Sequence, residues 1–314
     1  MVENLVSSIP QDFKERQIHM TEESSRKWFD ELPAILEKVI TQWEVYDCHL
    51  VEEMSFNNVI FYASSPQYGG VVVKIGHPAY ELFFSEPEAL RFYEGQDACK
   101  LYDLDSKNRA MLLERISPGI QLSEIGDMRE RISIAANLLR KISKPLCVPN
   151  HRIIGYEEMI PDYFQRAKTE TKDNSQILAL CGTAQQFFTE IISGKHVRVL
   201  THGDYHYRNI LLGEEGFKVI DPKGVAGFGF MDTAQLISNE LRMANGTTGF
   251  SHLDRAVNLV SKHTGYSIKL LSKWLFIASV WKVAGNVLYI KGNSEKTREK
   301  VERSELYLEY YQQV

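Results

Sequence analysis

The stretch that decides the fold reads His202-Gly203-Asp204-Tyr205-His206-Tyr207-Arg208-Asn209-Ile210-Leu211, and Val219-Ile220-Asp221-Pro222-Lys223-Gly224 follows shortly after it. Each motif adjoins an apolar run that is typical of a strand, so the polar residues are expected on two loops. Together the loops present a carboxylate, an amide and a second carboxylate. These groups suit the binding of a metal-bound polyphosphate while a proton is taken from an alcohol.

The three polar residues have separate predicted roles. Asp204 is expected to orient a substrate hydroxyl and to accept its proton, as a catalytic base. Asn209 and Asp221 offer oxygen ligands of the kind that Mg²⁺ prefers. Taken singly, each residue is equally typical of a turn or a helix cap. Their occurrence together favours catalysis.

The composition is that of an ordinary globular protein, with 44% hydrophobic and 25% charged residues in 314. Four separated cysteines without metal-ligand spacing indicate reduced thiols, and the start of the chain lacks the pattern of a signal peptide. A cytoplasmic protein is therefore expected. The stretch 274–290 is short for a membrane span and contains Lys282 and Asn286, so a buried helix is predicted. The net charge of −5 argues against nucleic-acid binding and is compatible with a cationic small substrate.

Hydrophobic periodicity divides the chain into a β-rich and a helical part. A helical extension within 1–42 precedes strands near 48–53, 59–63, 70–75, 98–103 and 109–114, with one helix at 81–95 inserted among them. Beyond Ser117-Pro118-Gly119 the pattern is mainly helical. The predicted domains are 1–116 and 117–314, an α+β fold with a five-stranded sheet lobe and a helical lobe. Predicted helices in the second domain are 123–142, 156–170, 175–193, 231–243, 251–264, 267–290 and 295–311, with short strands near 197–200 and 210–220.

The two motifs resemble those of the aminoglycoside phosphotransferase superfamily. The Asp221-Pro222-Lys223-Gly224 form is most similar to its streptomycin 6-kinase and hydroxyurea-resistance branch. The resemblance covers about residues 43–290. It implies a two-lobed protein-kinase-like fold with an antiparallel sheet in the first lobe, and it implies ATP and Mg²⁺ as cofactors.

The resemblance also assigns the nucleotide site. Lys74, on the apolar strand 71–75, is expected to bind the phosphates and to pair with Glu86, with Glu88 and then Glu81 as alternatives. No Gly-x-Gly-x-x-Gly loop is present, so phosphate contacts are expected from Ser55, Asn57 and Asn58. This departure leaves GTP open as the donor. A hinge that presents backbone groups to adenine is expected at Leu113, Glu114, Arg115 and Ile116.

Other residues near the motifs have supporting roles. His202 is expected to hold the catalytic loop through the backbone or Asp221, and Lys223 either contacts phosphate or faces solvent. Asp232 is expected to be the N-cap of the following helix. Candidates for acceptor recognition are the acids Glu157, Glu158, Asp162 and Glu240 and the aromatics Tyr205, Tyr207 and Trp281, although core packing or a solvated helix face is the commoner explanation for each of them.

The predicted function is phosphorylation of a hydroxyl of a small molecule. By resemblance, the acceptor is an aminocyclitol antibiotic of the streptomycin type. The alternatives are a metabolite acceptor, such as a sugar, a choline-like compound or an amino alcohol, and a nucleotide-binding pseudokinase. The sequence indicates neither a membrane partner nor an oligomeric state.

Overall fold

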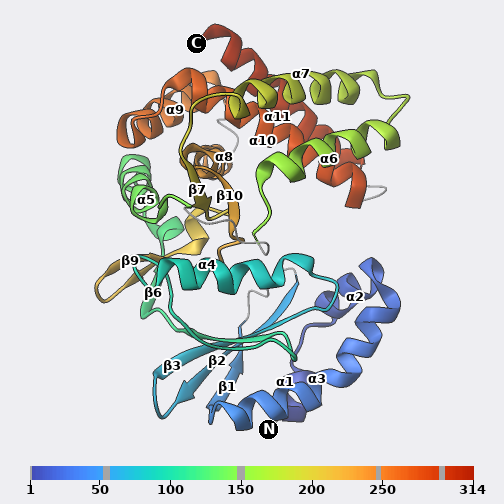
Figure 1. The fold of residues 1–314 in the computed structure, drawn as a ribbon, viewed down its shortest axis with the longest axis vertical. Coiled ribbons are helices and arrows are strands. Elements are labelled where there is room, and N and C mark those ends of the chain that lie inside the picture. Colours follow the sequence, from blue (N-terminus) through green and yellow to red (C-terminus); the bar gives the residue numbers. More distant parts are fainter. Residues whose placement is uncertain (1, 52–56, 147–152, 245–248, 290–293) are drawn as a thin grey trace. The chain divides into compact units, whose positions relative to one another are not determined.

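A computed structural model describes residues 2–51, 57–146, 153–244, 249–289 and 294–314 (Figure 1). The chain forms two compact units. Unit 1 comprises Met1–Ile120 and Leu212–Lys223, and unit 2 comprises Gln121–Leu211 and Gly224–Val314. This division differs from the boundary predicted after residue 116. The segment Leu212–Lys223, which contains Asp221, belongs to unit 1 because it is hydrogen-bonded there, as shown below.

Unit 1 contains a five-stranded sheet in the order β1-β2-β3-β5-β4, in which all neighbouring strands are antiparallel. One helix, α4 (Ser85–Tyr93), is inserted between β3 and β4, after a short 3-10 turn η1 (Glu81–Phe84). The predicted α+β lobe is therefore confirmed. The strands are β1 (Tyr46–Leu50), β2 (Asn58–Ser65), β3 (Gly69–Gly76), β4 (Leu101–Asp105) and β5 (Ala110–Glu114).

The alternation of side chains on β3 determines what each face of the sheet covers. Val71, Val73 and Ile75 point to one face, where they join a core with the helices α1 (Val2–Ser7), α2 (Gln11–Met20) and α3 (Glu22–Gln42). Lys74 lies between them in sequence and points to the other face, toward α4. Figure 1 shows α3 and α4 on opposite sides of this sheet. The helical extension predicted within 1–42 consists of the three helices α1, α2 and α3, and α2 and α3 are separate because the backbone leaves helical geometry at Thr21 (φ −149°, ψ 75°).

Two further boundaries differ from the predictions for physical reasons. The fourth strand begins at Leu101 rather than at residue 98, because Cys99 N–H donates to the Val219 carbonyl (2.9 Å) and Ala98 pairs with Val219. Helix α5 begins at Met128 rather than near 123. There the Asp127 carboxylate accepts the Glu130 N–H (3.0 Å) as an N-cap.

The buried residue His77 fixes α3 to the end of β3. Its Nδ1 accepts the Ala79 N–H (3.1 Å), so Nε2 carries the proton, and Nε2 lies 3.1 Å from the Ser25 hydroxyl. Trp28 packs edge-on against the ring. Burial, with a smaller contribution from Arg109, lowers the pKa of His77 from 6.5 to about 4.

We therefore expect the stability of the protein to fall between pH 6.5 and pH 4. The folded pKa is depressed, so in this window the unfolded chain binds the proton more readily and unfolding is favoured as the pH falls. Urea unfolding of wild type and His77→Gln across this window measures the effect. The wild type should lose about 2 to 3 kcal/mol more than the variant, and parallel pH profiles would contradict the account.

Unit 2 is built around the apolar helix α10 (Ile268–Tyr289), which was predicted at 267–290 as a buried helix. In the described part of the chain no helix is long and apolar enough to cross a membrane. Residues of α10 share one core with those of the surrounding helices. The helices around it are α5 (Met128–Ile142), α6 (Tyr156–Glu170), α7 (Ser175–Ile192), α8 (Thr233–Met243), α9 (Phe250–Thr264) and α11 (Ser294–Gln313).

Short strands carry the two motifs. Strand β7 (Arg198–Thr201) precedes Asp204 and pairs with β10 (Val225–Phe228), which was not predicted. The strand expected over 210–220 is a hairpin of β8 (Ile210–Gly213) and β9 (Gly216–Val219), and β8 also pairs with the unpredicted β6 (Pro118–Gln121). Asn209 immediately precedes the hairpin and Asp221 follows it.

Candidate active site

The strand lysine of unit 1 lies among carboxylates. Lys74 Nζ is 2.6 Å from Glu86 Oε2 on α4 and 2.5 Å from Asp221 Oδ1, and its side chain is only 3% exposed. Lys223 Nζ lies 2.8 Å from the other Asp221 oxygen. The structure therefore brings together four of the predicted site residues. Glu88 instead pairs with Arg91, and Glu81 is exposed.

Opposite charges account for the ionisation of this group. Burial would lower the pKa of the Lys74 ammonium, but the carboxylates of Asp221 and Glu86 reverse this effect and hold its pKa above the ordinary value. Burial would likewise raise the pKa of Asp221, which Lys74 and Lys223 hold below its ordinary value. The Lys74 and Lys223 ammonium groups and the Asp221 carboxylate are therefore charged at neutral pH. Two ammonium groups and an ionised carboxylate are a chemically suitable set for a polyphosphate and its cation.

The loop of Asp221 is fixed to unit 1 by hydrogen bonds and by backbone geometry. The Ser85 hydroxyl lies 2.6 Å from the Lys223 carbonyl oxygen, and Val219 N–H donates to the Asp97 carbonyl (2.9 Å). Asp221 itself has φ 55°, a left-handed conformation that aspartate tolerates better than most residues. The carboxylate is thereby directed at Lys74.

In unit 2, the loop after β7 is held by a buried acid. The Asp232 carboxylate accepts the His202 N–H (2.7 Å) and the Gly203 N–H (2.9 Å), and Asp232 is 1% exposed. Asp232 occupies the N-cap position of α8 as expected, but its side chain makes no capping bond to that helix, because both of its oxygens accept from the loop. Burial raises the pKa of Asp232 to about 7, against the opposing effect of these two N–H donors.

Asp204 and Asn209 lie on this loop. His202, which is fully buried, accepts the Asp204 N–H at Nδ1 (3.3 Å), and the Asn209 amide nitrogen donates to the Asp204 carbonyl (3.0 Å). The side chain of Asp204 is 30% exposed, so a substrate can reach its carboxylate. The backbone is thus anchored from both sides of Asp204.

Two residues that were not predicted as site residues are linked to this carboxylate, one by a direct hydrogen bond and the other through the first. Gln235 Nε2 donates to Asp204 Oδ1 (3.1 Å), and Lys282 Nζ donates to Gln235 Oε1 (2.5 Å). Gln235 lies on α8 and Lys282 on α10. Neither belongs to a motif, and only the packing of the helices brings them to Asp204.

The structure gives less support to the other residues predicted to bind the nucleotide. Ser55 lies outside the described residues. Asn58 is buried in β2, paired with Gly76, and the Asn57 carbonyl accepts the His77 N–H (2.9 Å). In the predicted hinge, the Glu114 N–H donates to the Lys100 carbonyl (2.9 Å) and the Arg115 N–H donates to the Gly70 carbonyl (3.4 Å), so these two groups are engaged within the protein.

The residues considered for acceptor recognition are largely engaged elsewhere. The buried Glu240 binds Arg131 (2.6 Å) and the Tyr207 hydroxyl (2.6 Å). Tyr205 and Tyr207 are fully buried, and Trp281 packs edge-on against Tyr156 and Tyr163. The three remaining acids lie on α6: Glu157 pairs with Arg198, Asp162 pairs with Arg166, and Glu158 lies 3.4 Å from the Gly155 N–H.

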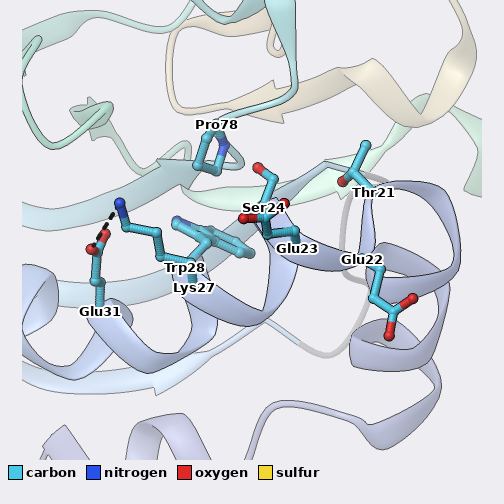
Figure 2. A pocket seen from close by; sticks show the side chains of 8 residues that line it. All are labelled: Thr21, Glu22, Glu23, Ser24, Lys27, Trp28, Glu31 and Pro78. Carbon is cyan, nitrogen blue, oxygen red and sulfur yellow. Dashed lines mark ion pairs between the residues drawn. The ribbon is translucent and has the colours of Figure 1, made fainter.

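A hollow of about 670 Å³ lies on the N-terminal extension, beside the start of α3 (Figure 2). Its lining includes Trp28, Pro78 and the Lys27–Glu31 pair, together with Glu22 and Glu23. None of the motif residues lines it. The acidic lining is also unsuited to phosphate, so the chemistry described above lies elsewhere in the chain.

A profile of the aminoglycoside/hydroxyurea antibiotic resistance kinases matches residues 62–286, which include both motifs and Lys74. The chain belongs to this family. It is accordingly a small-molecule kinase, a phosphotransferase with an alcohol group as acceptor, as the sequence predicted.

Known relatives agree with this assignment. The kinase is 25% identical over 227 residues to streptomycin 6-kinase from Streptomyces griseus, which covers 70% of this chain and 71% of that protein. Two solved structures share its fold. Choline kinase LicA from Streptococcus pneumoniae has a TM-score of 0.64 at 16% identity, covering 90% of this chain and 98% of that one. An amicoumacin kinase, solved with AMP-PNP and Ca²⁺, has a TM-score of 0.65 at 13% identity, with coverages of 94% and 97%.

Proposed function

We propose that this kinase transfers the γ-phosphoryl group of ATP to a hydroxyl of a small molecule, in a reaction that depends on Mg²⁺. The observation that carries the proposal is the pair of anchored carboxylates: Asp221 against Lys74 in unit 1, and Asp204 on the loop held by Asp232 in unit 2. The family membership and the nucleotide-bound structural relative support the same reaction.

Asp204 acts as the general base in this proposal. Its carboxylate accepts a hydrogen bond from the acceptor hydroxyl and takes the proton as the acceptor oxygen forms its bond to phosphorus. The bond from that phosphorus to the bridging oxygen breaks, and ADP leaves. Gln235 holds one carboxylate oxygen by a hydrogen bond, which orients the carboxylate toward the acceptor.

Lys74, Lys223 and Asp221 hold the nucleotide. Lys74, kept in place by Glu86, binds phosphate oxygens, and Lys223 contributes a second ammonium group. Asp221 and the amide oxygen of Asn209 are the proposed protein ligands of Mg²⁺. The bound ion would neutralise phosphate charge. In the described part of the chain no three His, Cys, Asp or Glu residues gather as a metal site. In the proposal, phosphate oxygens and water complete the coordination of the ion.

The acceptor is the open part of the function. Kinship with streptomycin 6-kinase supports an aminocyclitol antibiotic, and likeness in fold to choline kinase is compatible with a metabolite such as a sugar, a choline-like compound or an amino alcohol. The chemistry at Asp204 is the same for both. The acids that would meet amino groups are engaged by other residues, which counts against a strongly cationic acceptor.

An acceptor panel tests the proposed reaction. ADP release with Mg-ATP should depend on an added hydroxylated compound when streptomycin, other aminocyclitols, sugars, sugar acids and amino alcohols are compared. Turnover of antibiotics alone would establish a resistance enzyme, and turnover of metabolites alone would exclude one. No turnover of any compound, together with no thermal stabilisation by Mg-ATP, would contradict the proposal and favour a pseudokinase.

A further inference from the structure

Polar stripes of three helices meet in unit 2 near Asp204. Gln235, Ser238 and Arg242 recur at helical spacing on α8, and Lys282 and Asn286 do so on α10. Hydrogen bonds join these helices and α11. Lys282 binds Gln235 (2.5 Å), and Lys300 on α11 binds the Asn286 amide oxygen (2.5 Å). A single polar region therefore extends from Asp204 to α11.

This region is rich in positive charge. Arg242, Lys282, Lys300 and Arg303, here called the cation cluster, lie close enough to repel one another. Burial first, and then Arg242 and other cations of the cluster, lower the pKa of Lys282 to about 8. Burial also lowers the pKa of Lys300, followed by Lys296 and then by Arg303 and Arg242 of the cluster, and it lowers the pKa of Arg242, followed by Arg303. Among the described residues, no ion pair joins any member of the cluster to a carboxylate. Asp204 is the acid that acts on both Arg242 and Lys282.

The charge pattern of the helices explains why the cluster lacks acids. Helix α10 contains no Asp or Glu. On α11, Lys300 and Arg303 lie on the face that packs on α10, whereas Glu299 and Glu302 fall on a different face at helical spacing. The neighbouring acid of α8, Glu240, is buried and bound to Arg131. Repulsion within the cluster is thus relieved only in part, through Asp204.

Asn286 provides an independent sign of a ligand. It is 3% exposed, and in the described part of the chain its amide nitrogen has no hydrogen-bond partner, although its oxygen binds Lys300. A buried donor without a partner destabilises the folded protein. An acceptor atom in the cation cluster would satisfy it, and Arg242 is exposed, so solutes can reach the cluster.

We propose that the acceptor is a hydroxylated anion, whose carboxylate or phosphate group binds the cation cluster while its hydroxyl lies at Asp204. This inference rests on the phosphoryl transfer proposed above and specifies its acceptor. The connection from Lys282 through Gln235 to Asp204 places the cluster one side chain from the catalytic carboxylate. A polycationic aminocyclitol would be repelled by the same residues.

Four sugars that share ring hydroxyls but differ in charge form the test: glucose, glucuronate, glucose 6-phosphate and glucosamine, with streptomycin as a polycation. We expect an anion to be the preferred acceptor, with a kcat/KM at least about tenfold above that of glucose. The double variant Arg242→Gln/Arg303→Gln should raise the KM for the anion about tenfold or more. The matched control is Arg298→Gln, an exposed arginine of α11 paired with Glu302, which should change nothing.

A folding defect would not obscure the result, because removing mutually repelling charges should leave thermal stability unchanged or raised. Preference for glucosamine or streptomycin, or equal loss on all sugars in the double variant, would overturn the proposal and leave phosphoryl transfer standing. If no sugar is turned over, the thermal stability of the protein is measured with inorganic phosphate and with glucuronate. The proposal requires that these anions stabilise the wild type and that the double variant loses this effect. Absence of stabilisation in the wild type overturns the proposal. Failure of the proposed reaction would appear separately, as absent stabilisation by Mg-ATP.

Discussion

Replacement of Asp204 by asparagine is expected to lower kcat by about 100-fold or more, the usual contribution of a positioned general base. Asparagine keeps the size of the side chain, and its amide can still contact Gln235, but it cannot take up the hydroxyl proton. Steady-state ADP release with saturating acceptor measures the change. Thermal stabilisation of the variant by Mg-ATP should persist. Asp204 is neither one of the two lysines proposed to bind phosphate, Lys74 and Lys223, nor a proposed metal ligand.

A matched control separates chemistry from a loss of charge. Asp12 on α2 is an exposed acid outside the candidate site, and its partner is Arg16. Asp12→Asn should retain normal turnover, since exposed ion pairs contribute little. A kcat of Asp204→Asn close to that of wild type would remove Asp204 from the catalytic role.

The second large effect is expected from Lys74→Met. The variant leaves the carboxylates of Glu86 and Asp221 close together without their shared counter-ion, and the Glu86 side chain is only 3% exposed. Breaking such a buried pair from one side typically costs about 3 to 5 kcal/mol in the free energy of unfolding. Urea denaturation measures this loss, and stabilisation by Mg-ATP should disappear as well.

Two further variants sharpen this prediction. Lys74→Met/Glu86→Gln should recover part of the lost stability, because the second change removes the unpaired charge. Lys27→Met removes an exposed lysine of α3 and should alter stability by less than about 0.5 kcal/mol. An unfolding free energy of Lys74→Met equal to that of wild type would show that the observed contacts do not stabilise the unit.

The sequence predicted the elements well where local patterns determine them. Helix α6 spans the predicted residues 156–170, and Lys74 lies on a strand whose apolar neighbours point away from it. Predictions were less accurate where tertiary pairing decides. Ala98 and Cys99 pair with Val219 instead of joining the sheet, and β6 and β10 are four-residue strands without a pattern of their own.

The candidate site likewise combines residues that local motifs predict with residues that only tertiary packing brings together. Asp204, Asn209 and Asp221 follow from the spacing of two motifs. Gln235, Lys282 and the loop-holding role of Asp232 do not, because helical spacing indicates which residues share a face but not which helix that face meets. The cation cluster comes from three helices for the same reason. Its members therefore give no common signal in the sequence.

In the proposed reaction, Asp204 takes the proton of an acceptor hydroxyl as the γ-phosphoryl group of ATP is transferred to that oxygen. Transfer can be followed by ³¹P NMR of ATP labelled with ¹⁸O in the γ-phosphoryl group, with the acceptor that gives the fastest ADP release in the panel described above. We expect labelled phosphoester on the acceptor in amounts equal to ADP, at a rate about 100-fold or more lower in Asp204→Asn. Recovery of the label only as inorganic phosphate would exclude phosphoryl transfer to the acceptor, and equal rates for both proteins would exclude Asp204 as the base.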